Sequence, residues 1–341
     1  MPENDNIKNK NIKLSVAIPT YNGARYIREA LDSIIYQLDD IDEKIEIVIS
    51  DNESTDQTPE IIKEYQEKYP EIISYYRNDQ NLGPDKNIDL AVRRSKGEYV
   101  WLFSDDDVLK FPVLKKVLNV LNAYSDLSWI FVNYARYDNN LLSKIATVVD
   151  IPKDCYCKNG EDFFKITRFA NTALSSNIVR KREWENTYES IKGISALHTQ
   201  TVLSIYLLKN NKSYIISSHL IKFRNPKDNK PRWMEDKETY LGIGLNMLHY
   251  FYEALERNNY SYKLKKLLCK CFRYGIIYNI LKLKCNVDNL SKMTVCLIKR
   301  SCKKDFILFI VSFFCIYTPG WLVRIIYTQY KALKNIFICT K

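Results

Sequence analysis

The sequence lacks several patterns that would assign it to common classes of protein. Its first dozen residues are polar, without the apolar stretch of a secretory signal, so no such signal is expected. Nine cysteines, an odd number, show no framework spacing, and neither Cys155-x-Cys157 nor Cys269-x-Cys271 has the two-residue gap usual for zinc ligands. We therefore expect reduced thiols in the cytosol, and neither a disulfide framework nor a zinc site.

Apolar runs long enough to cross a bilayer as a helix, which takes about 20 residues, are also missing. The run Phe306–Tyr317 has twelve residues and is interrupted by Thr318-Pro319-Gly320 before the apolar stretch Trp321–Tyr327. This pattern predicts an interfacial or re-entrant membrane-associating segment over residues 306–327. A buried core helix of the C-terminal region is the alternative.

Charge is unevenly distributed along the chain. The net charge is +11, and residues 260–304 alone contain twelve Lys or Arg and one acidic residue, Asp288. A basic segment directly before an apolar one indicates an anionic membrane surface as partner, and no nucleic acid, because the apolar segment has no role in nucleic-acid binding. We therefore expect a peripheral or monotopic protein at the cytoplasmic face of the inner (plasma) membrane.

Within the first 125 residues, β-branched apolar runs alternate with stretches whose apolar residues recur at helical spacing. This alternation predicts βαβ units, and hence an α/β fold with a mostly parallel sheet. The expected strands are 14–19, 45–50, 72–76 and 99–103, and the expected helices are 24–37, 54–68 and 85–95. Ligands of such sheets bind at the carboxyl ends of the strands, where Asp51 and the run Asp105–Asp107 fall.

After residue 125 the alternation weakens. Further strands are expected at 127–134 and 214–223, part of a hairpin at 141–149, and helices at 163–170 and 199–208. From residue 241 onwards the pattern is helical and increasingly basic. We therefore predict an α/β domain over residues 1–235 and a basic helical region over residues 236–341.

Three successive aspartates, Asp105, Asp106 and Asp107, follow the fourth strand. Like charges held together repel, so they need compensation by a cation or by hydrogen-bond donors. A divalent cation bound to a nucleotide diphosphate is one such compensation, since Mg²⁺ usually takes one or two protein carboxylates plus phosphate oxygens. The alternative is a solvated turn that caps a helix beginning near Lys110.

Five sequence blocks occur in a characteristic order. They are Ser15–Asn22 (SVAIPTYN), Ile47–Asp56 (IVISDNESTD), Asn81-Leu82-Gly83 with Asn87, Lys96–Tyr99 (KGEY), and the aspartates. Over roughly residues 14–125 the chain thereby resembles the inverting family-2 glycosyltransferases of the GT-A fold, particularly abequosyltransferase-like and other O-antigen or capsule sugar transferases. The turn after the first strand has no G-x-G-x-x-G, which argues against a nicotinamide-dependent oxidoreductase.

The resemblance implies roles for individual residues. Asp51 would hydrogen-bond a nucleobase, Asp105 would face the ribose or sugar, and Asp106 would bind Mg²⁺ or Mn²⁺ with support from Asp107. The remaining nucleotide-binding positions would be Pro19, Thr20, Tyr21, Asn81, Gly83 and Lys86. One departure is that Ser104 stands where the family usually has the first Asp of its Asp-x-Asp motif. At Pro19, Gly83 and Asp51 a purely structural strand end or turn is the alternative.

An inverting transfer needs a general base that deprotonates the acceptor hydroxyl. The family usually places an Asp, often in a Glu-Asp pair, about 90 residues after its metal motif, but residues 193–200 (GISALHTQ) contain no carboxylate. His198 occupies about the right place and is predicted as the base, because the unperturbed histidine pKa lies near working pH. A packed or capping histidine is the alternative, and Glu185 and Glu189, in what is expected to be a loop, are other candidates.

The polar loop 224–233 follows a predicted strand and carries Arg224, Arg232 and Trp233, which suit closure over a diphosphate or stacking on a sugar. An ordinary surface loop is the alternative. The whole sequence thus predicts an enzyme that transfers a sugar from a nucleoside-diphosphate donor to an acceptor hydroxyl with inversion, on a lipid-linked glycan for O-antigen or capsule. Ser104 and the missing carboxylate base leave a non-catalytic sugar-nucleotide-binding or scaffold protein of the same fold as the rival.

Overall fold

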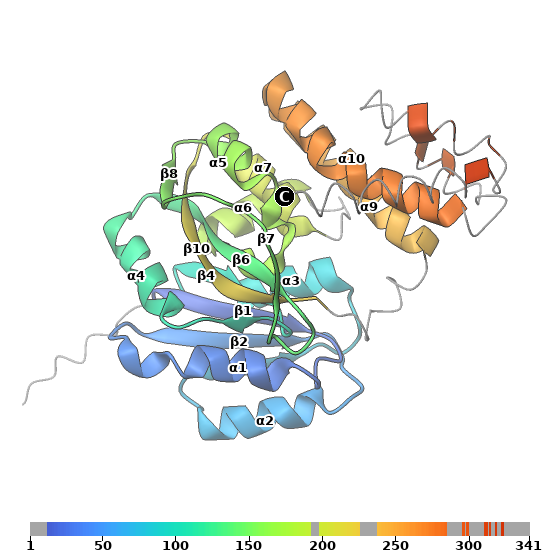
Figure 1. Ribbon diagram of the computed structural model, residues 1–341. Coiled ribbons are helices and arrows are strands. Elements are labelled where there is room, and N and C mark those ends of the chain that lie inside the picture. The colour runs from blue at the N-terminus through green and yellow to red at the C-terminus, as the bar shows by residue number, and fades with distance from the viewer. Residues whose placement is uncertain are drawn as a thin grey trace, which may run out of the picture. The chain divides into compact units, whose positions relative to one another are not determined.

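The computed structural model (Figure 1) describes residues 12–191, 198–225 and 237–284, with a few isolated positions beyond them. The chain divides into two compact units, Met1–Lys227 and Asp228–Lys341. The predicted domain boundary at residue 235 lies within the range 226–236, outside the described residues.

The first unit is built on a sheet with the strand order β3-β2-β1-β4-β9-β6-β10-β5, to which β7 adds beside β6 and β8 beside β10. Its strands are β1 (Leu14–Thr20), β2 (Ile45–Asp51), β3 (Ile73–Arg77), β4 (Tyr99–Leu102), β5 (Val108–Leu109), β6 (Leu127–Tyr137), β7 (Lys144–Thr147), β8 (Cys155–Cys157), β9 (Asn177–Arg180) and β10 (Lys212–Arg224).

One half of the sheet, β3-β2-β1-β4, is parallel throughout, as predicted. β2 is buried along its whole length and β1 along nearly all of it, which explains why both read as continuous apolar runs. Parallel strands end at the same edge, so the residues after β1, β2 and β4 meet there. The pairing of Thr20 with Asp51 marks that edge.

The other half of the sheet is mixed. The short strand β9 pairs antiparallel with both β4 and β6, and β10 runs parallel to β6 but antiparallel to β5 and β8. β7 pairs antiparallel with β6, which confirms the predicted hairpin. The parallel arrangement expected from the first 125 residues is therefore interrupted where β9 inserts beside β4, and it returns only in the pairing of β6 with β10.

Helices cover both faces of the sheet. Figure 1 shows α1 and α2 on one side and α3 on the other, as right-handed crossovers require when the strand order reverses after β3. The helices of this unit are α1 (Ile27–Ile35), α2 (Thr58–Lys68), α3 (Pro84–Arg94), α4 (Val113–Ala123), α5 (Gly160–Thr167), α6 (Lys181–Ile191) and α7 (Thr199–Leu207).

One alternative and one expectation are wrong. The aspartates do not cap a helix near Lys110, because strand β5 follows them and α4 starts only at Val113 with Pro112 as N-cap. The region of Glu185 and Glu189 is helix α6, not a loop. The sequence of α6 hides its periodicity, since Trp184 and Ile191 are the buried residues of an otherwise polar helix.

The described part of the second unit contains α9 (Lys237–Arg257) and α10 (Tyr262–Lys284), as the helical pattern predicts. The two helices pack against each other, with the rings of Phe251 and Phe272 in an edge-to-face contact at 5.8 Å. Within the described residues, no helix combines the length and apolar character needed to cross a membrane. Most of the predicted segment 306–327 lies outside the described residues.

Candidate active site

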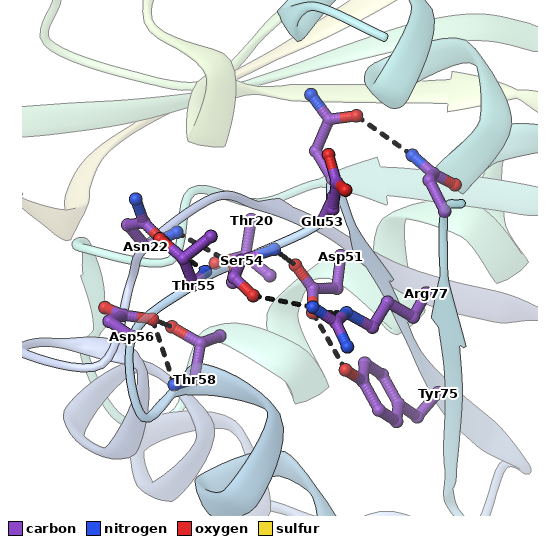
Figure 2. A network of polar contacts seen from close by, with 12 residues as sticks. Thr20, Asn22, Asp51, Glu53, Ser54, Thr55, Asp56, Thr58, Tyr75 and Arg77 are labelled. Atoms are coloured by element: carbon purple, nitrogen blue, oxygen red, sulfur yellow. Dashed lines mark hydrogen bonds and ion pairs between the residues drawn. The ribbon is translucent and has the colours of Figure 1, made fainter. Parts of the chain in front are cut away.

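The loops after β1 and β2 are joined by hydrogen bonds at the carboxyl edge of the sheet (Figure 2). The amide N–H of Asn22 donates to Ser54 Oγ at 2.9 Å, and the Thr55 N–H donates to Asn22 Oδ1 at 2.8 Å. Asn22 has a positive φ of 55°, which asparagine tolerates better than most residues. The two loops therefore form one rigid rim beside the sheet edge.

Asp51 lies beneath this rim with no exposed surface. Its Oδ1 accepts the Ser54 N–H at 2.8 Å, and its Oδ2 accepts the hydroxyl of Tyr75 at 2.8 Å. Arg77 Nε lies 3.7 Å from Oδ2 (Figure 2). Each oxygen keeps a second lone pair, so the predicted contact with a nucleobase requires one of these lone pairs to become accessible, and otherwise Asp51 only shapes the turn.

The other predicted nucleotide-binding residues border the same edge. Asn81 Oδ1 accepts from Asn52 Nδ2 at 2.8 Å and from the Gly83 N–H at 3.0 Å. Gly83 has a φ of 81° and precedes α3, so this turn requires glycine. Lys86 on α3 is exposed, Tyr21 is 49% exposed, and Pro19 is half-buried in β1.

Asp105 contacts the β1 loop directly. Its carboxylate accepts a hydrogen bond from the buried Thr20 hydroxyl. A Cβ atom on Gly23 would lie 2.3 Å from Asp105 Oδ2 and 2.6 Å from Thr20 Oγ1, so a side chain there would displace the Asp105 carboxylate. Gly23 is a site residue that the sequence reasoning missed, although its place directly after the first block was a usable signal.

The two following aspartates have different surroundings. Asp106 is half-buried and accepts a hydrogen bond from Ser104 Oγ at 2.6 Å. Asp107 is fully buried, with Oδ2 accepting from Ser175 Oγ at 2.6 Å and Oδ1 accepting from the Arg224 N–H at 3.0 Å. Ser104 thus supports Asp106, while both oxygens of Asp107 are used inside the protein.

Burial and mutual repulsion disfavour the ionised form of these aspartates. Burial, then the charge of Asp106, raises the pKa of Asp105 to about 7. Burial raises the pKa of Asp106 and, together with the Asp106 charge, raises the pKa of Asp107 well above its usual range. A cation near Asp105 and Asp106 would reverse this effect, because opposite charge stabilises a carboxylate.

The oxygen ligands at this turn fit a hard divalent cation whose other ligands come from a phosphate group. Asp105 and Asp106 offer oxygen ligands, the kind that Mg²⁺ and Mn²⁺ prefer. Over residues 12–191, 198–225 and 237–284 no three His, Cys, Asp or Glu side chains gather as a complete metal site. Phosphate and water oxygens would therefore have to complete the coordination of a metal held here.

Arg224 does not belong to the loop in which it was predicted. It is the last residue of β10, and its side chain is 2% exposed. Its Nε donates to the Asp106 carbonyl oxygen at 2.8 Å, and its Nη2 pairs with Glu29 Oε2 at 2.9 Å. Arg232 and Trp233 lie outside the described residues.

His198 immediately precedes α7. Its Nδ1 lies 3.2 Å from the carbonyl oxygen of Thr172. A carbonyl only accepts, so Nδ1 carries a proton and, in the neutral ring, Nε2 keeps the lone pair that a base needs. Burial lowers the pKa of His198, which the Thr172 carbonyl and the charge of Asp85 partly oppose.

The alternative bases are engaged elsewhere on α6. Glu185 lies 3.6 Å from Lys181 in the same helix, and Glu189 lies 2.7 Å from Arg93 of α3. Of the three candidates, His198 is the one bonded to the segment that also contacts the aspartates.

That segment, residues 170–176, links α7 to the aspartate turn. Its Thr172 carbonyl contacts His198 and also accepts from Gln200 Nε2 at 2.9 Å. Ser175 Oγ accepts the Ser104 N–H at 2.9 Å while it donates to Asp107. Sequence reasoning missed the segment, because its short polar pattern (ANTALSS) has no recognisable period.

Sequence comparison places the chain in a family. The model of glycosyl transferase family 2 matches residues 15–184. Abequosyltransferase RfbV of Salmonella typhimurium is 30% identical over 237 residues, which cover 63% of this chain and 67% of the relative. The chain belongs to glycosyl transferase family 2. Poly(ribitol-phosphate) beta-N-acetylglucosaminyltransferase TarS of Staphylococcus aureus is 36% identical over 104 residues, 30% of this chain and 18% of TarS.

Solved structures agree with the family on the fold. S. aureus TarS 1–349 in complex with UDP has a TM-score of 0.58 at 16% identity and covers 89% of this chain and 90% of that one. The mannosyltransferase PcManGT of Pyrobaculum calidifontis, in complex with GDP-Man and Mn²⁺, has a TM-score of 0.51 at 16% identity, over 95% of this chain and 87% of that one. The chain is a family-2 glycosyltransferase with the GT-A fold, as its sequence blocks predict.

Proposed function

We propose that this family-2 enzyme transfers a sugar from a nucleoside-diphosphate donor to an acceptor hydroxyl, with inversion at the sugar C1 and with a divalent cation. The observation that supports this most is the carboxyl edge of the sheet. There the Thr20–Asp105 hydrogen bond joins the end of β1 to the aspartates after β4, next to Asp51 of β2.

In this proposal each residue at the sheet edge has a separate role. Asp51 and the Asn81–Gly83 turn bind the base and ribose, and Asp105 orients the ribose or sugar. Asp106 binds the metal, which when bound would stabilise the negative charge of the leaving diphosphate. Asp107 supports Asp106 by fixing the turn, since both its carboxylate oxygens are bonded within the protein. His198 accepts the acceptor proton at Nε2.

The acceptor in this proposal is a lipid-linked oligosaccharide at the cytoplasmic membrane face, destined for O-antigen or capsule. The RfbV relative is an abequosyltransferase, which supports transfer of a sugar by this chain. The basic stretch 260–304 and the apolar run Phe306–Tyr317 behind it supply the reason to place the enzyme at an anionic membrane.

Donor turnover by the variant Asp106→Asn tests the catalytic part. Release of nucleoside diphosphate from a panel of nucleotide sugars would be measured with Mn²⁺ or Mg²⁺. We expect turnover to fall at least about 10²-fold with the fold intact, because each tenfold corresponds to about 1.4 kcal/mol of lost transition-state stabilisation. Asp89→Asn is the control, since that buried carboxylate is held by Arg93 and Trp184 and not by the aspartate turn. Near-normal turnover of Asp106→Asn would contradict the assignment.

A further inference from the structure

Arg224 is a buried cation that contacts the aspartate turn, although it lies far from that turn in the sequence. Arginine side chains are mostly exposed, and full burial normally requires partners. Arg224 has such partners on every guanidinium nitrogen. Nε bonds the Asp106 carbonyl oxygen, Nη1 bonds the Asn139 carbonyl oxygen, and Nη2 pairs with Glu29.

Arg224 bonds two neighbouring aspartates, one through its side chain and the other through its backbone. Its side chain fixes the backbone of Asp106 through the 2.8 Å bond from Nε. Its backbone N–H fixes the carboxylate of Asp107 through a 3.0 Å bond to Oδ1. The orientation of the turn between β4 and β5 therefore depends on the end of β10, more than a hundred residues later in the chain.

Two further elements complete this contact. The guanidinium lies over the Tyr26 ring, 4.2 Å from its centroid, in a cation–π arrangement. The Tyr26 hydroxyl in turn donates to Asn139 Oδ1 at 2.7 Å. Arg224 thus ties together the start of α1, the turn between β6 and β7, and the aspartates.

These contacts use three of the five guanidinium N–H donors, and the side chain is only 2% exposed, so Arg224 is poorly placed to clamp a diphosphate itself. We propose instead that Arg224 is a positioning residue, which holds the Asp105–Asp107 turn in the geometry that binds the metal and diphosphate. This inference rests on the proposed metal-dependent function. A planar fork that bonds three acceptors at once cannot be replaced by the single ammonium of lysine.

The variant Arg224→Lys keeps the charge and removes the fork. Calorimetry would measure the affinity of whichever of UDP, GDP, CDP or dTDP binds the wild type best, with and without Mn²⁺. We expect the gain in affinity from Mn²⁺ to shrink at least tenfold in Arg224→Lys, while affinity without metal changes less than about threefold. Glu29→Gln removes the negative charge that pairs with Nη2 at the half-exposed rim, and we expect the gain in affinity from Mn²⁺ to fall about two- to fivefold.

Arg180→Lys is the matched control. Arg180 also lies over a tyrosine ring, that of Tyr99 at 5.1 Å, and bonds its hydroxyl, but it lies at the opposite end of β4 from the aspartates. We expect a lower melting temperature and an unchanged gain from Mn²⁺ in this variant.

Different failures have different meanings. A wild-type gain from Mn²⁺ in Arg224→Lys overturns the positioning role, and so does an unchanged gain in Glu29→Gln if Arg224→Lys does not fold. A wild-type protein that binds none of the four nucleotides, or binds them equally with and without Mn²⁺, overturns the proposed function itself.

Discussion

At the scale of single residues, the two hydrogen bonds of Asp51 can be tested by separate substitutions. Asp51→Asn preserves an acceptor for the Ser54 N–H but loses the second carboxylate oxygen, which a nucleobase N–H would need. We expect nucleoside-diphosphate affinity to fall by about 1.5–3 kcal/mol, the range for a hydrogen bond to a charged group, with little effect on turnover at saturating donor. Isothermal titration calorimetry and donor kinetics measure the two effects.

Tyr75→Phe provides the complementary measurement for Asp51. The Tyr75 hydroxyl occupies Asp51 Oδ2 in the structure, so its removal should leave nucleotide affinity unchanged or raise it. If Asp51 only shapes the turn, both variants will lower the melting temperature and neither will change affinity.

His198 should give turnover a dependence on pH of known sign. A base must be neutral to accept a proton, and burial lowers the pKa of His198 from its ordinary 6.5. At saturating Mn²⁺, we therefore expect the fall of turnover on the acid side to be centred below pH 6.5. His198→Gln should reduce turnover about 10²–10⁴-fold while the donor still binds.

The glutamates of α6 are the controls for His198. Glu185→Gln and Glu189→Gln should retain near-normal turnover, because the two side chains are held in ion pairs with Lys181 of α6 and Arg93 of α3. An acid limb centred above pH 6.5, or a normal rate in His198→Gln, would argue against histidine as the base.

At the scale of elements, segment 170–176 should matter to the site through Ser175. Ser175→Ala removes the donor to Asp107 and leaves the Ser104 N–H without its acceptor. Unsatisfied buried groups cost about 1–3 kcal/mol each, so we expect a lower free energy of unfolding together with weaker Mn²⁺ binding. Urea unfolding and metal titration measure the two.

Ser176→Ala is the neighbouring control. Ser176 is also buried, but its hydroxyl donates only to the Ala173 carbonyl oxygen within the same segment, at 2.7 Å. We expect some loss of stability and no change in metal affinity. Equal metal affinity in wild type and Ser175→Ala would show that the segment only packs.

The local sequence pattern predicted those elements that lie within one short window of sequence. The β-branched runs predicted β1 and β2, and the helical spacing predicted α1 and α3. The position of the aspartates after β4 was predicted in the same way. Long-range pairing could not be predicted this way. β9 has four residues, and nothing in Asn177–Arg180 reveals that it lies between β4 and β6.

The same limit applies to the candidate site. Arg224 has the sequence context of a loop cation, yet it is buried because Glu29, Tyr26 and Asn139 surround it. None of these partners is near it in sequence. Likewise, the separate roles of Asp106 and Asp107 depend on Ser104 and Ser175, and only Ser104 is close to the aspartates in sequence.

At the scale of the whole molecule, the C-terminal region differs in net charge from the rest of the chain. Residues 260–304 carry a net charge of +11, which equals that of the entire protein, so the remainder of the chain is neutral in sum. Residues 305–341 add +3, so residues 1–259, which include the sheet, carry a net charge of −3. An anionic surface would attract the C-terminal region and leave the nucleotide-binding end without net attraction.

This asymmetry leads to a prediction about membrane binding. Each basic residue near an anionic leaflet contributes about 1 kcal/mol, and the run Phe306–Tyr317 adds apolar area without the length to span. Two such signals hold more firmly than either alone. Full-length protein should float with anionic liposomes, and high salt should release it only partly, because salt screens the charges and not the apolar contact. Deletion of residues 301–341 should abolish flotation while nucleotide binding survives. Flotation of the truncated protein, or no binding of the full chain to either anionic or neutral liposomes, would mean that Phe306–Tyr317 is an ordinary core helix.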